Sequence, residues 1–236
     1  MIAHLYFSPN GETMKIASYF HRRLGGVLHD LTDPDIRESF PLHTAHEEVI
    51  LSFPVYAQRI PIPLRAFFKQ LSVKRLIINV TFGGFSYGNA LYEAYKCVAP
   101  NVLVGYSITP VRHAYLSGDV RIDYERYEPL IDRFPTSSSG ITPPYRFKNV
   151  FAHLFERTRT RINDRITIDR KTCIDCHRCQ DACPMRAIDS DYTLTSDCLR
   201  CDLCVKICPV QAITTKKSLF LKLYLRKKPK RKTIIR

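Results

Sequence analysis

The sequence predicts an α/β protein, in which a doubly wound parallel sheet of five strands precedes a small α+β domain that holds metal. Two features indicate this organisation. In the first 110 residues, short apolar runs alternate with helical patterns, as in stacked βα units. Eight of the nine cysteines then lie between Cys173 and Cys208, and such crowding in one short stretch indicates metal chemistry in one small domain.

Five short runs of mainly apolar residues are the expected strands. They are Ile2 to Phe7, Val27 to Leu31, Glu48 to Phe53, Arg75 to Phe82 and Val102 to Ser107. Helices are expected between them, over Glu12 to Leu24, near Pro63 to Leu71 and in the stretch that runs through Cys97. Five strands with intervening helices fit a doubly wound sheet.

The pattern weakens between Arg112 and Pro144, where a short helix is expected near Tyr124 to Phe134. Tyr145 to Arg161 looks helical again, because its apolar residues form one stripe that could cover the sheet. We therefore assign residues 1–163 to the first domain and its connecting segment.

The composition is that of a globular chain. With 45% hydrophobic and 25% charged residues, the 236-residue chain is not mainly disordered or collagen-like. It has no apolar run of about 18 residues, and its first residues lack the basic flank and long apolar stretch of a secretory signal. We therefore expect a soluble cytoplasmic protein, in which disulfides are not favoured.

The cysteines form an internal repeat. The run from Cys173 to Ile188 returns 25 residues later, from Cys198 to Ile213, with all four Cys, the Pro, the Ala and the Ile in register. Each copy has the form C-x2-C-x2-C-x3-C-P. Two copies of one unit predict two copies of one site.

Zinc is the main alternative to iron at these sites, because two CxxC pairs separated by a loop also describe a zinc ribbon. Zinc, however, gives no reason for a third Cys after two residues, or for the Cys-Pro that ends both copies. The spacing favours iron–sulfur clusters, since three closely spaced thiolates can bind three corners of a cube.

The segment 164–215 resembles the bacterial-type ferredoxins with two [4Fe-4S] clusters, and expected strands at Arg165 to Asp169 and Ala212 to Thr215 flank its repeats. The resemblance implies that the last Cys of each run binds the cluster of the other run. Cluster one then takes Cys173, Cys176, Cys179 and Cys208, and cluster two takes Cys198, Cys201, Cys204 and Cys183. Apolar residues next to the ligands are expected to bury the clusters, more so in the second run. They are Ile174, Leu199, Leu203, Val205 and Ile207. Two unequal reduction potentials are therefore expected.

A second candidate site follows the first expected strand. The loop Phe7 to Thr13 leads directly into a helix, whose N-terminus offers backbone N–H groups to a phosphate. It resembles the FMN-phosphate loop of flavodoxins, which Ser8, Gly11 and Thr13 match. Pro9, Asn10 and Glu12 differ, and Glu12 brings a carboxylate near the expected phosphate. The predicted contacts are Ser8, Asn10, Gly11, Glu12 and Thr13.

Two further loops support a flavin site, since both follow strands and so belong to the edge where doubly wound sheets bind ligands. Their aromatic side chains could flank a flat ring, and their N–H groups could bond its polar edge. The predicted contacts are Pro54, Val55, Tyr56, Thr81, Phe82, Gly83, Gly84 and Tyr87. Ordinary sheet-edge turns are the alternative reading. A dinucleotide site is disfavoured, because no G-x-G-x-x-G follows a strand.

Residues 1–215 as a whole look like the flavodoxin–ferredoxin fusion proteins of anaerobic microbes. The resemblance implies a flavodoxin-like first domain and electron transfer between FMN and two [4Fe-4S] clusters, with redox proteins as partners. A flavin-dependent reductase of a small substrate, with the clusters as an internal relay, is the alternative. A third reading, structural clusters with a nucleic-acid-binding arm, is disfavoured.

The last segment, residues 216–236, is a basic tail with ten Lys and Arg and no acid. Without it, the chain has 26 basic and 22 acidic residues. The segment is too short and too charged to span a bilayer. Four readings of the tail stay open: adhesion to an anionic membrane surface, docking to an acidic redox partner, non-specific nucleic-acid contact and a partly ordered solvated tail.

Two other residues receive plain structural roles. Cys97 has no cysteine or histidine at metal spacing nearby and is expected to be a core thiol. His177 lies between predicted ligands and is expected to be a surface residue beside the cluster. No histidine is assigned a catalytic role, and the oligomeric state is left open.

Overall fold

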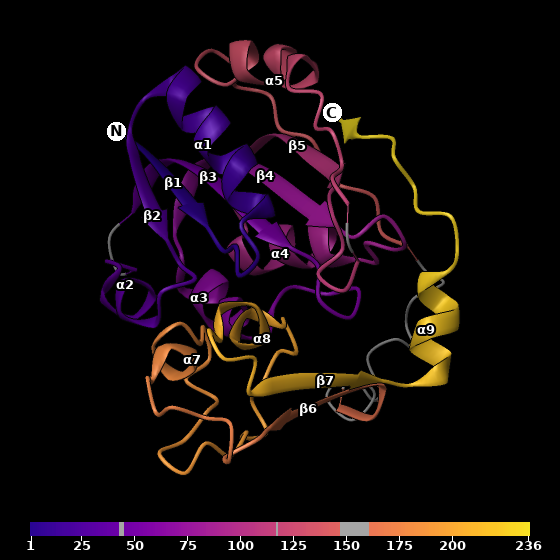
Figure 1. The fold of residues 1–236 in the computed structure, drawn as a ribbon. Coiled ribbons are helices and arrows are strands. Elements are labelled where there is room, and N and C mark those ends of the chain that lie inside the picture. The colour runs from indigo at the N-terminus through magenta and orange to yellow at the C-terminus, as the bar shows by residue number, and fades with distance from the viewer. Residues whose placement is uncertain (43–44, 117, 147–160) are drawn as a thin grey trace.

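A computed structural model describes residues 1–42, 45–116, 118–146 and 161–236. Its main sheet has the strand order β2–β1–β3–β4–β5–β8 (Figure 1). The strands are β1 (Ile2–Tyr6), β2 (Val27–Asp30), β3 (His46–Pro54), β4 (Val73–Phe82), β5 (Val102–Pro110) and β8 (Ile234–Ile235). The first five are parallel to their neighbours, and the order 2-1-3-4-5 is that of flavodoxin-like sheets. The predicted α/β fold class is confirmed.

Helices cover both faces of this sheet (Figure 1). One face packs against α1 (Glu12–Leu24) and the short pair η1 (Glu125–Tyr127) and α5 (Glu128–Arg133). The other packs against α3 (Ile62–Gln70) and α4 (Ala90–Val98). Neighbouring residues of β3 serve the two faces in turn, since Ile50 packs in the α1 cluster and Leu51 in the α3 cluster. Burial on both faces explains why the strands read as unbroken apolar runs.

The second unit is built on an antiparallel pair, β6 (Asp164–Ile168) and β7 (Ile213–Lys217), with α7 (Arg178–Asp181) and α8 (Leu203–Ile207) between them. The sequence repeat is also a backbone repeat. Residues with positive φ recur 25 positions apart, at Asp175 and Arg200, His177 and Asp202, and Arg186 and Gln211. Each cysteine run is therefore folded by the same sequence of turns, although none of these residues is glycine.

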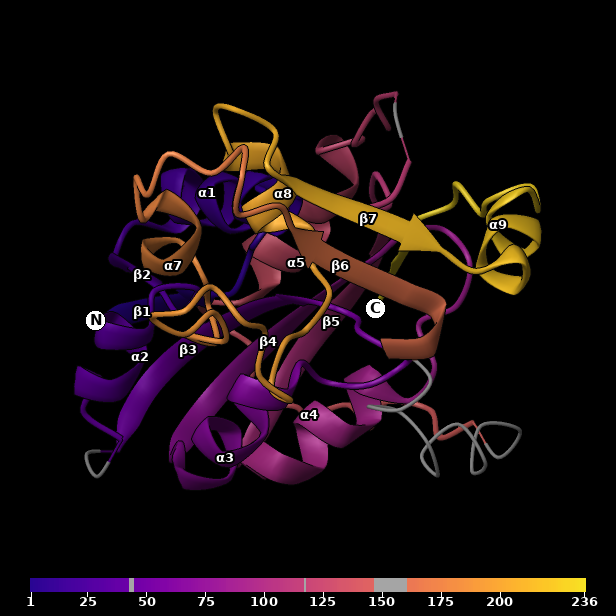
Figure 2. The same ribbon diagram turned by 60° about the horizontal axis from the view of Figure 1, so that its bottom comes forward.

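The second unit lies at one end of the main sheet (Figures 1 and 2). Direct bonds join the two parts: Arg37 Nη2 donates to the Pro184 carbonyl at 3.1 Å, and Tyr115 Oη donates to the Arg200 carbonyl at 2.7 Å. Arg186 is ion-paired with Glu38 at 3.3 Å and with Asp35. These contacts fix the cysteine-rich unit against the sheet.

The segment assigned as a basic tail contains two regular elements. Helix α9 (Leu219–Leu225) begins at Ser218, whose Oγ accepts the Leu221 N–H at 3.1 Å. The chain then returns to the sheet, where β8 runs antiparallel to β5 and Arg236 exchanges two backbone bonds with Tyr106. The end of the chain is thus part of the main sheet.

Several short elements were not predicted: α2 (Pro34–Ser39), α7, α8, α9 and β8. The α2 start has a recognisable signal, since Asp33 caps the Asp35 N–H at 2.8 Å and Pro34 is the first helical residue. The helix predicted over Tyr145 to Arg161 lies mostly outside the described residues. Among the described helices, none has the length and apolar character needed to cross a membrane.

Candidate cofactor sites

The fold brings the eight cysteines of the repeat together as two groups of four. One small cavity is lined by Cys173, Cys176, Cys179 and Cys208. A second is lined by Cys183, Cys198, Cys201 and Cys204. Each group takes three thiols from one run and the last thiol of the other, which is the partition implied by the ferredoxin resemblance. All eight are free thiols, and no three His, Cys, Asp or Glu side chains of the described residues converge on one ion position.

The two groups differ in burial. In the first group Cys176 is exposed, and its neighbour Ile174 has 59% of its surface exposed. In the second group Cys201 is buried, and burial raises the pKa of Cys201 and of Cys204 to about 12. A metal ion binds the thiolate form and displaces the proton of each thiol, so loading of this site with metal releases protons. Cys179 of the first group is buried as well, so the difference between the groups is that only the first contains an exposed cysteine.

A larger cavity of about 370 Å³ lies where the main sheet meets the second unit, and we call it the interface cavity. The loops after β1, β3, β4 and β5 supply one side of it. The second unit supplies Asn163, Asp164, Leu199 and Arg200, and α9 supplies Phe220, Leu221 and Tyr224. Its volume falls in the range of small-molecule and cofactor sites.

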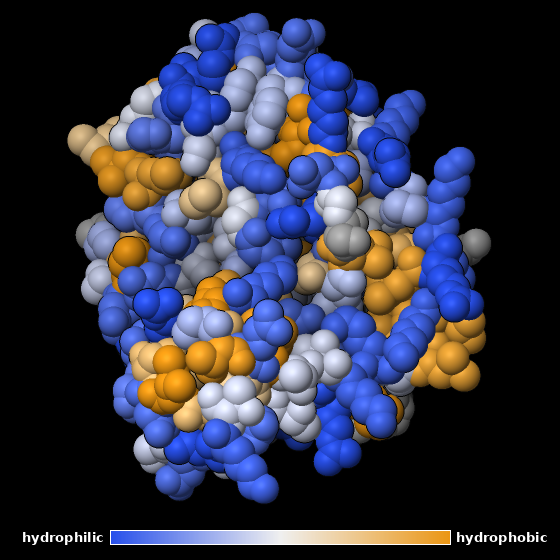
Figure 3. Space-filling model, in the orientation of Figure 1, coloured by the Kyte–Doolittle hydropathy of each residue, from blue (hydrophilic) through white to orange (hydrophobic). Residues whose placement is uncertain are grey.

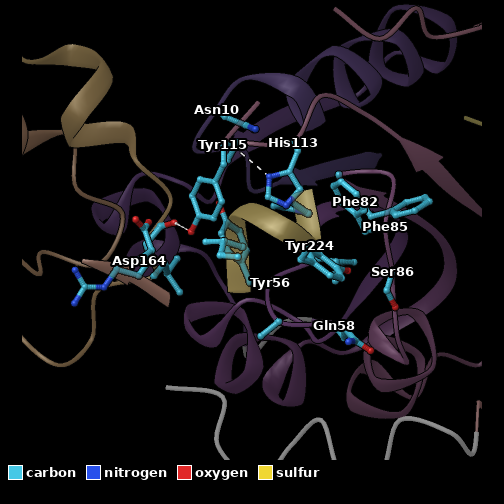
Figure 4. A pocket seen from close by; sticks show the side chains of 18 of the residues that line it. Asn10, Tyr56, Gln58, Phe82, Phe85, Ser86, His113, Tyr115, Asp164 and Tyr224 are labelled. Carbon is cyan, nitrogen blue, oxygen red and sulfur yellow. Dashed lines mark hydrogen bonds between the residues drawn. The ribbon is translucent and has the colours of Figure 1, made fainter. Parts of the chain in front are cut away.

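Aromatic rings dominate the interface cavity. In Figure 4, the rings of Tyr56, His113, Tyr115 and Tyr224 gather around its centre, while Phe85 and Asp164 lie toward opposite sides. Phe85 packs against His113 with ring centroids 5.6 Å apart and against Tyr224 at 5.0 Å. Flat, mainly apolar walls with a few polar groups suit a planar aromatic ligand.

Leu199 connects the interface cavity to the second cysteine group. It lines both cavities, is only 8% exposed and packs in the core cluster of the main sheet. Tyr56 also lines the interface cavity. Burial, and then the neighbouring Cys201, raises the pKa of Tyr56 well above its usual value. The second cysteine group is thus the one next to the interface cavity.

Seven of the thirteen residues predicted for FMN line this cavity, and six do not. Of the residues predicted in the first loop, Asn10 alone lines the cavity. The ends of β3 and β4 and the loops after them supply the other six: Pro54, Val55, Tyr56, Thr81, Phe82 and Gly83. Ser8, Gly11, Glu12, Thr13, Gly84 and Tyr87 lie outside its lining. The loops at the carboxyl ends of the strands therefore meet as expected, but most of the first loop does not face the cavity.

Internal bonds occupy the hydroxyls of that first loop. Ser8 Oγ accepts the Met14 N–H at 3.0 Å, and Thr13 Oγ1 is 2.7 Å from Thr81 Oγ1 in a buried pair. Gly11, at φ +80°, makes the turn before α1. Both hydroxyls help to fix the loop, so a phosphate at the helix start would have to rely on backbone N–H groups.

Glu12 lies inside the protein, with 2% of its surface exposed. Its carboxylate is 3.1 Å from Lys15 Nζ and 3.2 Å from Arg112 Nη2. The two cations outnumber this carboxylate and leave the group with one net positive charge. Arg112 also lines the interface cavity, so it offers that charge to an anionic group there.

Gly84 and Tyr87 have structural roles. A Cβ on Gly84 would approach Pro229 Cβ to 2.6 Å, and the Gly84 carbonyl accepts the Lys230 N–H at 2.6 Å. This glycine allows the C-terminal segment to cross the loop. Tyr87 packs edge-on against Phe82 and carries the Arg146 guanidinium over its ring at 4.0 Å.

The sequence analysis missed Arg112, His113 and Tyr115, which follow β5 and line the interface cavity. The same rule that selected the loops after β3 and β4 also applies to this loop, because β5 ends at the same edge. Burial, with a smaller effect of Lys217, lowers the pKa of His113 to about 4. The imidazole is therefore neutral near pH 7 and adds no charge to the cavity.

A buried charge cluster lies between the interface cavity and the second cysteine group. Lys217 Nζ is 3.1 Å from Asp202 Oδ2 and 3.7 Å from Asp164 Oδ1, and it lies 4.3 Å from the centre of the Tyr115 ring. Burial, and then the neighbouring Asp164, raises the pKa of Asp202 to about 6. One ammonium thus serves two buried carboxylates, next to both candidate cofactor sites.

The two residues with predicted structural roles fit them. Cys97 lies on α4, is half-buried and packs against the core cluster of the main sheet. Burial raises the pKa of its thiol. His177 is exposed beside the first cysteine group, where its Nδ1 lies 2.6 Å from Gln180 Oε1.

Comparison with known proteins finds a family match in the second unit. Residues 165–209 match the family model of the 4Fe-4S dicluster domain. All eight cysteines of the repeat lie within this match, which supports a 4Fe-4S cluster in this unit. The matched segment is a minor part of the chain, and the family match says nothing of the main sheet.

The other comparisons give weaker likenesses. No curated protein sequence matches the chain. A solved structure of a candidate flavoprotein from Bacteroides eggerthii DSM 20697 aligns with a TM-score of 0.34 and 17% sequence identity, over 58% of this chain and 98% of that one. The reading of the main sheet therefore depends on its own strand order and cavity.

Proposed function

We propose that the protein is an iron–sulfur flavoprotein that relays electrons between an FMN in the interface cavity and two [4Fe-4S] clusters. The observation that carries this proposal is the shared wall at Leu199, where the interface cavity meets the cavity of the second cysteine group. A cofactor in the larger cavity would be separated from a cluster in the smaller one by little more than this side chain. Close, rigid juxtaposition of two redox sites in one chain favours electron exchange between them.

In this proposal, the eight cysteines divide as they do in the fold. Cys173, Cys176, Cys179 and Cys208 hold the outer cluster, and Cys183, Cys198, Cys201 and Cys204 hold the inner one. The exposed thiol of Cys176 places the outer cluster near solvent, where a redox partner protein can approach. The inner cluster then connects it to the interface cavity.

The residues of the interface cavity suit FMN in two respects. The aromatic side chains of Tyr56, His113 and Tyr115 can flank the flat ring system, and the amide of Asn10 and the guanidinium of Arg112 can bond the phosphate. When bound there, FMN would exchange one or two electrons, whereas each cubane exchanges one.

The chain itself positions the cofactors and keeps water out. Tyr115 holds the second unit through its bond to the Arg200 carbonyl, and Leu199 seals the wall between the two cavities. Phe220 and Tyr224 of α9 cover another side of the interface cavity. Such burial raises the energetic effect of every nearby charge, including Lys217.

A flavin-dependent reductase of a small substrate is the second candidate. Its support is the set of polar groups in the same cavity, above all Gln58, Arg112 and Asn163, which could orient a substrate beside the ring. The two candidates differ in one test. The protein is first reduced and then mixed with the small substrate, with no protein acceptor present. A reductase is reoxidised at a rate that depends on the substrate concentration.

The first test is a count of cofactors. Protein purified without oxygen and reconstituted with iron, sulfide and FMN is expected to hold about eight irons and one flavin per chain. Arg112→Ala is expected to weaken FMN binding about tenfold, because a charge-assisted phosphate contact is lost, while the iron count stays the same. Fluorescence titration of the flavin measures this change.

Arg121→Ala is the matched control, since Arg121 is exposed and does not line the interface cavity. It should leave FMN affinity unchanged. Eight irons without any flavin would contradict the flavoprotein proposal and leave a ferredoxin on a sheet of another function. A colourless protein that binds zinc would contradict the proposal as a whole.

A further inference from the structure

Helix α9 presents an apolar face to solvent. Leu219 is 73% exposed, Phe220 67% and Leu223 51%. Their spacing places the three side chains on one side of the helix, whereas Leu221 and Tyr224 turn toward the interface cavity. Ile162, 70% exposed, lies just before β6, whose partner strand β7 leads into α9.

Positive charge surrounds this face. Lys222 lies within α9, and Arg226, Lys227 and Lys228 follow directly after it. Lys216 precedes the helix, and Lys230, Arg231 and Lys232 continue the basic run. All of these side chains are exposed, and none is ion-paired with a carboxylate in the described part of the chain. No acidic residue occurs from Lys216 to the end of the sequence.

Figure 3 shows the arrangement on the surface: an orange apolar area at the position of α9 is bordered by blue hydrophilic side chains of the C-terminal segment. Apolar side chains flanked by lysine and arginine are the features of helices that lie in a membrane interface. The apolar residues enter the boundary of the acyl chains, and the basic residues face the headgroups.

We propose that the α9 face, made of Leu219, Phe220, Leu223 and their basic neighbours, docks the protein on an anionic lipid surface. Charge favours lipid over a protein partner, because the cations on both sides of the apolar stripe form no ion pair with the described residues and their segment contains no acidic residue. Both ends of the C-terminal segment are held in place. Ser218 caps its start, and β8 ties the end of the chain to the main sheet.

Docking of this kind also orients the molecule. Phe220 belongs to the exposed face and to the lining of the interface cavity. The cavity would therefore open beside the lipid surface, whereas the outer cysteine group belongs to the far end of β6 and β7 from α9. This orientation does not depend on which cofactor the cavity holds.

The test is cosedimentation of the full-length reconstituted protein with vesicles. Binding is expected to vesicles that contain phosphatidylglycerol, to be much weaker with phosphatidylcholine alone, and to fall with added salt. Lys227→Glu with Lys228→Glu should weaken binding by at least twentyfold, since each basic residue near such a surface contributes about a fivefold effect. Leu219→Gln with Leu223→Gln should weaken it about tenfold or more, because two buried leucines are lost.

Matched controls lie elsewhere on the surface. Ile36→Gln removes an exposed apolar residue of α2, and Arg121→Glu with Arg126→Glu reverses two exposed charges near η1. These variants should bind vesicles like the unmodified chain. The proposal is overturned if the unmodified protein ignores anionic vesicles, or if both control variants lose binding as strongly as the α9 variants. It is also overturned if light scattering shows a dimer that the two leucine substitutions dissociate, since the face is then an interface between copies.

Discussion

Glu12 shows how one buried side chain changes what a loop can bind. From the sequence, the loop after the first strand offers a phosphate site in which this glutamate is the misfit. In the fold, the carboxylate turns inward and is held by Lys15 and Arg112. The negative charge of Glu12 is thereby balanced, and the group of three keeps one net positive charge beside the interface cavity, which Arg112 lines. A residue outside the predicted loop has become the best candidate for the phosphate contact.

Paired cysteine substitutions test which cysteines bind the same cluster. The two groups of four predict that Cys183 and Cys201 belong to one cluster, whereas Cys183 and Cys176 belong to different clusters. The double variant Cys183→Ala, Cys201→Ala should therefore keep one intact four-iron cluster. The double variant Cys183→Ala, Cys176→Ala should keep none, because it damages both.

Mössbauer spectroscopy of the iron-57 protein counts the intact clusters in each variant. The two variants remove the same number of thiols, so each controls for the other. An intact cluster in the Cys183, Cys176 variant and none in the Cys183, Cys201 variant would show that each run supplies its own four ligands.

At the scale of elements, the ends of the strands position the site. The loops after β1, β3, β4 and β5 meet at one edge, as the parallel order requires. The sequence predicted the loops after β3 and β4 from their aromatic and glycine residues. It could also have shown Arg112 and His113 after β5, since the same rule applies to them. No local pattern shows that α9 returns to close the cavity, because that contact joins segments far apart in the chain.

Strand β8 gives an element-scale prediction. Deletion of residues 233–236 removes two backbone bonds between Arg236 and Tyr106, the packing of Ile235 and the buried Thr233. We expect a loss of about 2–4 kcal/mol in the free energy of unfolding, from lost hydrogen bonds and apolar burial. Urea unfolding followed by circular dichroism measures it.

Arg236→Ala is the control for this truncation, since Arg236 bonds to Tyr106 through its backbone alone. It should change the stability by less than about 0.5 kcal/mol. Equal stability of the truncated and full chains would mean that β8 adds nothing to the sheet.

At the scale of the whole molecule, the contact between the two parts matters most. The sequence predicted both parts, because apolar runs and a cysteine repeat are local signals. It could not predict that Leu199 and Arg200 of the cysteine repeat form a wall of the cavity at the sheet edge. Apolar and basic residues also occur elsewhere in the repeat, so the sequence does not single out these two. Their place in the cavity wall results from the packing of one unit on the other. The proposed electron relay depends on that packing.

The most direct test of this relay is electron transfer within single molecules. FMN in the anaerobic reconstituted protein would be reduced by a light pulse with EDTA as the sacrificial electron donor, and the absorbance of flavin and clusters would be followed as electrons redistribute. The account predicts first-order redistribution with a rate constant that stays the same on tenfold dilution. A rate that falls in proportion to protein concentration would show that electrons pass between molecules, and would contradict a relay through the wall at Leu199.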